Sequence, residues 1–309
     1  MQVLHDLDPE PIGRLRAAGE FFWLDLERPT PQDVDRLGEL FGFDPFALED
    51  TREFGQRPKL DPYDGHVLIV FFGTEGQDLV EVHVYVSGQA IVTVRHGHCG
   101  TMRHAHERLA RIHGRSEDEA VYRVLDALTD SFFPTLEAIE AEVEALEEAI
   151  LAGTTPGQQE SILRLRRRLA ALRRVAGPQR DVLASGVLLI EMLPGLAPDE
   201  RHPWLRDIQD HLRSIAERID SQREALDQAL DLYVAGTNYR LNQVIKQLTV
   251  VATIFLPLTF VTGFFGQNFG WLVDHISSLT AFLAYGVGGT VVAGLLLLGW
   301  FRRSGFFGT

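Results

Sequence analysis

The stretch NQVIKQLTVVATIFLPLTFVTGFFGQNF, residues 242–269, decides the class of this protein. Residues 247–273 contain no charged side chain, and residues 276–301 contain none either. Each stretch is longer than the roughly 20 apolar residues that an α-helix needs to cross a bilayer core of about 30 Å. The sequence therefore predicts two transmembrane helices, at residues 244–266 and 279–301.

Charged residues around the two spans indicate how the chain crosses the membrane. Basic residues lie near the start of the first span and after the end of the second: Arg240, Lys246, Arg302 and Arg303. The connecting loop, residues 267–278, carries only Asp274 as a charged group, so the positive-inside rule makes this loop external and residues 302–309 a basic cytoplasmic tail. The N-terminal stretch MQVLHDLDPEPIG is acidic where an export signal is basic. We therefore expect a plasma (inner) membrane protein with both termini in the cytoplasm.

The residues before the first span predict a cytoplasmic domain in two parts. The chain has 309 residues, of which 45% are hydrophobic and 23% charged, enough apolar material for a packed core. Residues 1–115 predict an α/β domain, because short apolar runs alternate with turn signals. These runs are HVLIVFF (66–72), EVHVYV (81–86) and AIVTVRH (90–96). Residues 116–243 show helical periodicity and predict a helical stalk region.

The stalk sequence leaves two structural alternatives open. A glutamate-rich helix precedes an arginine-rich one at about 158–184, which indicates an antiparallel pair, whereas two independently solvated faces are the alternative. A third helix begins near Trp204 and meets no proline until Pro257. Because glycine inside a helix costs about 1 kcal/mol, the helix either continues to Gly266 or breaks near Gly236.

Composition and motifs exclude several classes of function. A formal net charge of -14 argues against a nucleic-acid partner and is compatible with a protein that handles cations. Cys99 is the only cysteine, which excludes an internal disulfide and a cysteine-rich zinc module. The sequence shows no nucleophile with an evident base, no phosphate loop and no cofactor fingerprint, so we do not expect an enzyme. The glycine-rich stretch 286–294 favours close packing of membrane helices.

One stripe of the first span is polar or small at its ends and apolar in its middle. Its members recur every three or four positions: Asn242, Ile245, Leu248, Ala252, Leu256, Thr259, Gly263 and Gly266. Several copies of such a helix around a symmetry axis can line a pore. The alternative is that Asn242 and Thr259 hold membrane helices together.

The quoted stretch and the second span resemble the CorA family of magnesium channels, whose signature reads approximately YGMNF. The resemblance extends back through WLRDIQDH (204–211) and RPKLDPYDGHVLIVFF (57–72), so it covers most of the chain from about residue 57. It implies a funnel-shaped homopentamer in the lipid bilayer, with the long first membrane helix lining the pore. The implied activity is passive uptake of Mg²⁺, with Co²⁺ and Ni²⁺ as further ions.

Carried over by position, the resemblance gives the stripe residues their roles. The outer selectivity ring comprises Gly266, Gln267 and Asn268. Thr259 and Gly263 line the pore below this ring. Leu248 and Leu256 are hydrophobic constrictions, and Asn242 lies at the cytoplasmic end. Magnesium gives up its water reluctantly, so a neutral ring of amide and backbone oxygens suits a hydrated ion. Gln267 stands where the family usually has methionine, which puts the selectivity in question.

The family also senses metal in its cytoplasmic domain, where carboxylates of neighbouring subunits bridge a regulatory ion. Asp207 matches the acidic sensor position of the family. Its partner in the segment GTEGQDLV (73–80) is either Glu75 or Asp78. The alternative is that these residues are ordinary exposed carboxylates.

The segment RHGHCGTMRHAHER (95–108) departs from the family pattern. It contains Cys99 and four histidines: His96, His98, His104 and His106. Such ligands suit Zn²⁺, Co²⁺ or Ni²⁺ better than Mg²⁺, but their spacing matches no standard metal module, which favours solvated loop histidines. The alternatives to a magnesium channel are a zinc or other transition-metal transporter of the same superfamily, and a membrane-anchored coiled-coil scaffold that transports nothing.

Overall fold

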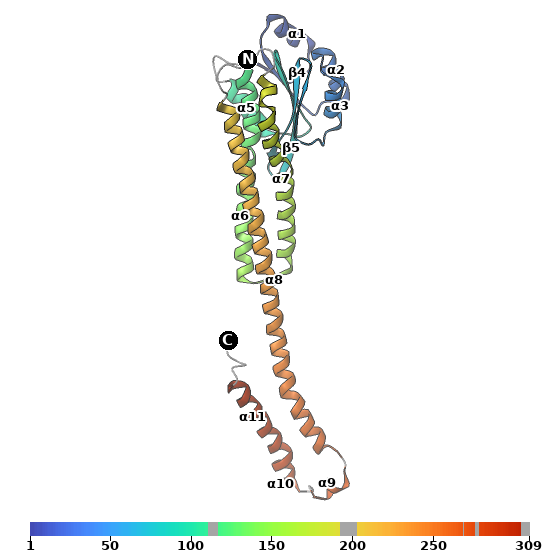
Figure 1. Cartoon of the computed structure of the whole chain (residues 1–309). Coiled ribbons are helices and arrows are strands. Elements are labelled where there is room, and N and C mark those ends of the chain that lie inside the picture. Colours follow the sequence, from blue (N-terminus) through green and yellow to red (C-terminus); the bar gives the residue numbers. More distant parts are fainter. Residues whose placement is uncertain (111–116, 192–202, 268, 276–277, 304–309) are drawn as a thin grey trace. The chain divides into compact units, whose positions relative to one another are not determined.

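The computed structural model describes residues 1–110, 117–191, 203–267, 269–275 and 278–303. It divides into two units, Met1–Tyr233 and Val234–Thr309, and Figure 1 identifies their elements. The first unit contains a six-stranded sheet in the order β1-β2-β6-β5-β4-β3. The strands are β1 Gln2–Leu4, β2 Phe22–Glu27, β3 Lys59–Tyr63, β4 His66–Glu75, β5 Asp78–Ser87 and β6 Ala90–Arg95.

The sheet is mixed, as expected for an α/β domain. Strands β1, β2 and β6 are parallel, and the pairs from β6 through β5 and β4 to β3 are antiparallel. Strand β4 extends three residues beyond the predicted run 66–72, because it pairs with β5 as far as Glu75 and Asp78. Gly76 makes this two-residue turn possible with a φ of 60°, a left-handed conformation that glycine adopts without strain.

Three short helices connect β1, β2 and β3. They are α1 Pro9–Ala18, α2 Pro31–Phe41 and α3 Pro45–Glu53. Each begins with a proline, and the residue before it accepts a backbone hydrogen bond through its side chain: Asp8, Thr30 and Asp44. Aspartate and threonine are preferred at this position because they satisfy a free N–H group, and proline fits the first turn because it lacks one.

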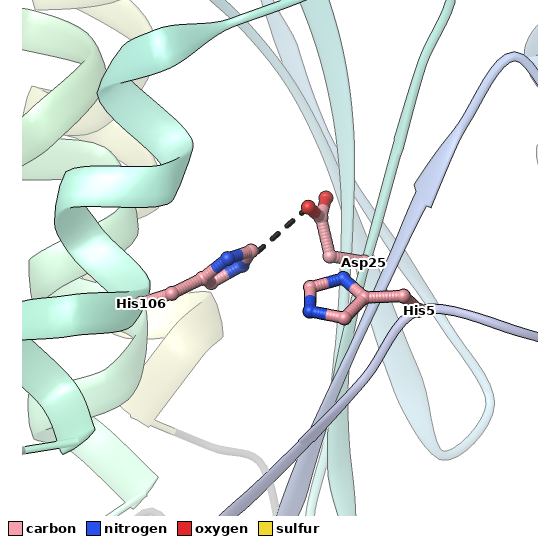
Figure 2. Close-up of side chains that lie close together, drawn as sticks. All are labelled: His5, Asp25 and His106. Carbon is pink, nitrogen blue, oxygen red and sulfur yellow. Dashed lines mark ion pairs between the residues drawn. The ribbon is translucent and has the colours of Figure 1, made fainter.

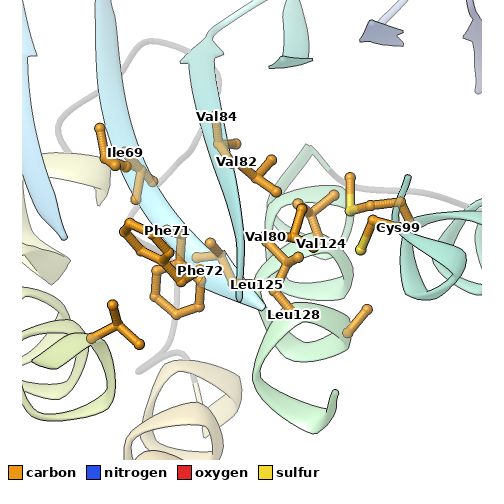
Figure 3. Packing of buried hydrophobic residues seen from close by; sticks show 14 of the residues in the cluster. Ile69, Phe71, Phe72, Val80, Val82, Val84, Cys99, Val124, Leu125 and Leu128 are labelled. Atoms are coloured by element: carbon orange, nitrogen blue, oxygen red, sulfur yellow. The ribbon is translucent and has the colours of Figure 1, made fainter. Parts of the chain in front are cut away.

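The two faces of β5 contact different helices because side chains alternate along a strand. On one face, the Tyr85 hydroxyl donates to the Ala47 carbonyl oxygen in α3 at 2.7 Å. On the other face, Val80, Val82 and Val84 gather with residues of α5 (Figure 3). Both faces of the sheet are thus buried, which explains the long apolar runs of β4 and β5.

Long helices follow the sheet. They are α4 Gly100–Ala110, α5 Glu117–Asp130, α6 Phe132–Ala152, α7 Pro156–Glu191 and α8 Pro203–Phe265. The predicted pairing of the acidic and basic helices is confirmed, since Glu142 in α6 lies 3.3 Å from Arg164 and 2.6 Å from Arg168 in α7. Helix α8 joins them through Arg218, which contacts Glu140 at 2.7 Å. Helix α8 also continues through position 236, so the alternative of a break there is wrong.

The second unit contains the remainder of α8 and the following helices. These are α9 Gly270–His275, α10 Leu279–Ala281, the π-helix η1 Phe282–Val287 and α11 Gly288–Arg303. Two candidate membrane spans, Arg206–Phe265 and Leu279–Arg303, have apolar stretches that the described chain leaves unburied. A Cβ atom added at Gly294 would lie 3.8 Å from Leu258 Cδ2, so α11 approaches α8 at a glycine. The segment expected to be only a loop, 267–278, also contains α9.

Candidate pore and metal-sensing sites

The predicted pore stripe lies on one side of α8 and is exposed along its whole length. Its exposed members are Asn242, Ile245, Leu248, Ala252, Leu256, Thr259, Gly263 and Gly266. The constriction residues Leu248 and Leu256 are 68% and 75% exposed. Leu258, which approaches α11, is partly buried and lies on the opposite side of the helix. The stripe therefore faces away from the second apolar helix and is available to another molecule.

The side chain of Thr259 presents oxygen lone pairs on this stripe. Its hydroxyl donates to the Phe255 carbonyl oxygen one turn earlier, at 2.8 Å. Because a hydroxyl has one donor and two acceptor positions, this bond uses the proton and leaves acceptor capacity. Water bound to a cation donates hydrogen bonds, so Thr259 is suited to contact a hydrated ion.

The predicted selectivity ring lies where α8 ends. The Gly266 N–H donates to the Thr262 carbonyl oxygen at 3.0 Å, and the Gln267 N–H donates to the Phe264 carbonyl oxygen at 3.3 Å. The carbonyl end of a helix carries partial negative charge, which attracts cations. A Cβ atom at position 266 would lie 3.2 Å from the Thr262 oxygen, a tight contact that glycine avoids. Asn268 lies outside the described residues.

The predicted sensor residue Asp207 lies in the N-terminal part of α8, with its side chain half exposed. Its Oδ2 accepts a hydrogen bond from the Tyr122 hydroxyl at 3.1 Å, and its Oδ1 lies 3.9 Å from His211 Nε2. The candidate partners differ from each other. Glu75 accepts a hydrogen bond from the Gly100 N–H at 2.8 Å, whereas Asp78 is exposed at the start of β5.

Next to Asp207 lies a cluster that can hold a cation, formed by Asp126, Asp130 and His211. One ligand atom of each lies within 4.8 Å of the others. His211 Nδ1 is 3.2 Å from Asp130 Oδ1. Burial raises the pKa of the Asp126 carboxyl, and the neighbouring Asp130 charge raises it further. A bound cation would relieve this repulsion.

The comparison with known proteins decides the family. A family model described as a CorA-like Mg²⁺ transporter protein matches residues 18–303. The chain belongs to this CorA family. The resemblance inferred from the sequence is therefore confirmed, and the chain is a member of a family of divalent-cation transporters rather than of enzymes.

Individual relatives agree with this assignment. The chain is 31% identical to a cobalt/magnesium transport protein CorA of Thermotoga maritima, over 86% of this chain and 78% of the relative. It is 30% identical to the putative metal ion transporter YfjQ of Bacillus subtilis, over 93% of this chain and 90% of the relative. The fold matches a solved structure of the CorA magnesium transporter from Methanocaldococcus jannaschii with a TM-score of 0.81, at 24% identity and over 92% and 90% of the two chains. The predicted fold class, an α/β domain with long helices and two C-terminal apolar helices, is confirmed.

Sequence reasoning missed three residues beside Asp207 in this CorA chain. Asp126 and Asp130 are four residues apart in α5, and so are Asp207 and His211 in α8. Residues at this spacing lie on the same face of a helix. The spacing thus predicts that the two members of each pair are neighbours. It does not predict that the two pairs meet, because this depends on the packing of α5 beside α8.

The histidines of 95–108 do not form one site among the residues whose side chains the structure describes. His96 and His98 are exposed between β6 and α4, and His98 Nδ1 lies 3.6 Å from Glu27. His104 lies in α4, and its side chain is outside the described part. His106 is largely buried in α4, and burial lowers its pKa to about 4. The solvated-loop interpretation therefore fits His96 and His98 and is wrong for His106.

Proposed function

We propose that this CorA-family protein is a passive uptake channel for divalent cations, with hydrated Mg²⁺ as its main ion and Co²⁺ and Ni²⁺ as others. It assembles as a homopentamer in the plasma membrane with both termini in the cytoplasm. Residues 244–266 line the pore, 267–278 lie outside and 279–301 form the second span. The observation that carries the proposal is the exposed stripe of α8, which is polar at both ends and apolar between them.

Each part of the stripe has a physical role in this proposal. At the outer end, the carbonyl groups of the last turn of α8 and the Asn268 amide accept hydrogen bonds from ion-bound water. Around Leu248 and Leu256, close approach of apolar side chains excludes water and closes the pore. At the inner end, Asn242 again offers a neutral amide. Neutral oxygens guide a hydrated ion without holding it tightly, which permits passage.

The membrane potential is a sufficient source of energy. It supplies about 2.3 kcal/mol per elementary charge per 100 mV, hence roughly twice this for a divalent ion moving inward. Uptake by this protein therefore requires no nucleotide and no coupled ion.

Cytoplasmic metal closes the channel in the same proposal. A regulatory Mg²⁺ binds at Asp207 and its neighbours Asp126 and Asp130, where carboxylate oxygens are ligands that Mg²⁺ prefers. Of the two predicted partners from an adjacent subunit, Asp78 is the better one. It is exposed, whereas Glu75 already binds the Gly100 N–H.

A zinc or other transition-metal transporter is the second candidate function. It is favoured by His211, whose imidazole lies among these carboxylates and is a better ligand for transition metals than for Mg²⁺. Cation flux into liposomes that contain the purified protein separates the candidates when Mg²⁺, Co²⁺, Ni²⁺ and Zn²⁺ are compared. Flux of Zn²⁺ alone selects the second candidate, and flux of no ion indicates the scaffold.

A matched pair of variants tests the pore stripe in the same assay. Leu248→Asn places an amide at the proposed constriction, so the pore stays hydrated and leaks Mg²⁺ when internal metal is high. Val251→Asn makes a similar change at an exposed residue outside the stripe, where Val251 is 52% exposed. We expect a leak from the first variant and none from the second. Equal flux through both variants and the parent would contradict the assignment of the pore face.

A further inference from the structure

Three residues far apart in the sequence meet at one edge of the sheet (Figure 2). His5 directly follows β1, Asp25 lies in β2, and His106 lies in α4. Strands β1 and β2 are parallel, with Leu4 opposite Leu24. The next residue along each chain segment is His5 after β1 and Asp25 in β2, so these two residues are neighbours. The two imidazole rings lie beside each other next to the carboxylate, in an edge-on contact with their centroids 5.2 Å apart.

The distance between His106 and Asp25 fits the coordination of one ion, and His5 lies close enough to join them. One ligand atom of each residue lies within 4.8 Å of the others. His106 Nε2 is 3.4 Å from Asp25 Oδ2, which is long for a hydrogen bond. Two ligands at 2.0–2.1 Å from a tetrahedral Zn²⁺ ion lie about 3.4 Å apart. His106 Nε2 is shielded from solvent and makes no hydrogen bond to any residue in the described chain.

A second layer of contacts fixes the carboxylate of Asp25. Its Oδ1 accepts hydrogen bonds from the Thr93 hydroxyl, at 2.6 Å, and from the Arg95 guanidinium. The Trp23 indole N–H donates in turn to the Thr93 oxygen at 2.9 Å. These donors occupy one oxygen, so Oδ2 is directed at His106. Metal-binding carboxylates are commonly oriented by such outer contacts.

We propose that His5, Asp25 and His106 form a binding site for a divalent transition-metal ion, with Zn²⁺ preferred. Two imidazoles and one carboxylate suit Zn²⁺, Co²⁺ or Ni²⁺, whereas Mg²⁺ selects oxygen ligands and keeps its water. Three protein ligands leave the fourth tetrahedral position to a water molecule. His5 is exposed and provides the entry side, and Asp25 and His106 form the buried side. The bound ion links α4 to the edge of the sheet.

The test is Zn²⁺ binding to the purified full-length protein, measured by calorimetry in excess Mg²⁺ so that oxygen-rich sites are already filled. We expect one more Zn²⁺ per chain in the parent than in His5→Ala, or at least about a tenfold loss of affinity in that variant, since even outer-contact changes cost 10- to 100-fold. His5 is exposed, so its removal leaves the core intact. His106→Ala provides a second variant, whose folding is checked by thermal unfolding.

His98→Ala is the matched control, because His98 is an exposed histidine of the same region that lies beside Glu27. It should bind Zn²⁺ as the parent does. Co²⁺ gives a second readout, because a tetrahedral Co²⁺ site absorbs strongly in the visible range, and this absorption should disappear in His5→Ala. The proposal is overturned if His5→Ala and a folded His106→Ala both bind Zn²⁺ with the stoichiometry and affinity of the parent. Cation flux is not measured here, so such a result leaves the channel proposal intact.

Discussion

The substitution Asp126→Asn tests whether the cluster beside Asp207 is a cation site. Asp126 is 5% exposed, and its ligand oxygen lies within 4.8 Å of those offered by Asp130 and His211. Burial and the Asp130 charge raise the pKa of Asp126, so its ionised form destabilises the metal-free protein. Asparagine keeps the shape and removes the charge. We therefore expect the substitution to stabilise the metal-free protein at pH 7.

The size of the effect follows from the distance between the charges. At 4.8 Å, the upper limit of the separation, two like charges repel by ~3.5 kcal/mol at an effective dielectric constant near 20. The Asp130 side chain is 41% exposed, so solvent screening reduces this to about 1–2 kcal/mol. Because the folded-state pKa of Asp126 is raised, its contribution to stability is fully present below the unfolded value near 3.8. That contribution is lost as the pH rises through the folded pKa, and Asp126→Asn should lack this slope.

Magnesium should stabilise the parent more than it stabilises Asp126→Asn. At 100 times its dissociation constant, a ligand that binds only the folded state adds about 2.7 kcal/mol. For a cooperative unit of the size of Met1–Tyr233 this corresponds to a rise in Tm of roughly 5–10 °C. Asp126→Asn replaces one charged carboxylate ligand with a neutral amide, so the rise in Tm caused by Mg²⁺ should shrink to a few degrees. The measurement is thermal unfolding of the purified protein in detergent, with and without Mg²⁺, at several pH values.

The control for this measurement is Asp231→Asn, an exposed aspartate farther along α8. It should leave both the metal-free Tm and the Mg²⁺ response as in the parent. The reasoning is refuted if Asp126→Asn lowers the metal-free Tm while the rise with Mg²⁺ stays that of the parent. Repulsion would then be absent from the cluster, and the cation would bind elsewhere.

Two further predictions concern the outer end of the pore. Asn268→Ala removes the side-chain acceptors and should abolish rescue of a magnesium-uptake-deficient bacterial strain at limiting Mg²⁺. Gln267→Met should preserve rescue. Full growth with Asn268→Ala at normal pentamer yield would rule out this turn as the selecting site. Asp274→Cys should react with an impermeant thiol reagent added outside the cell, and reaction only from the inside would reverse the proposed topology.

Local sequence signals predicted much of the fold. The charge-free stretches 247–273 and 276–301 gave both apolar helices, because membrane thickness sets the length that a span needs. The long helix was also predicted, although the sequence did not decide whether position 236 would break it. One glycine costs about 1 kcal/mol, and a helix of 63 residues accommodates this cost. The π-helical turn at Phe282–Val287 had no sequence signal that we recognised.

Side-chain clusters were harder to predict because they depend on packing between distant segments. Tyr122 and Asp207 are 85 positions apart and form a hydrogen bond. His5 and His106 meet only because β1 pairs with β2 and α4 lies beside them. Periodicity indicates which face of an element a residue occupies, but not which other element contacts that face. His106 was thus grouped with its sequence neighbours, whereas its partner in the fold is Asp25.

The two clusters of the first unit, Met1–Tyr233, differ in the ligands that they offer to an ion. The cluster around Asp126 and Asp207 is rich in carboxylate oxygens and partly exposed, so a hydrated Mg²⁺ can bind there and keep some of its water. The site at Asp25 combines one available carboxylate oxygen with two imidazoles, and this ligand set has low affinity for Mg²⁺ and higher affinity for Zn²⁺. The first cluster has two carboxylates and one imidazole, His211, whereas the site at Asp25 has one carboxylate and two imidazoles. A larger share of imidazole ligands favours a transition metal over Mg²⁺, so the selectivity of the site at Asp25 comes from ligand type rather than from net charge.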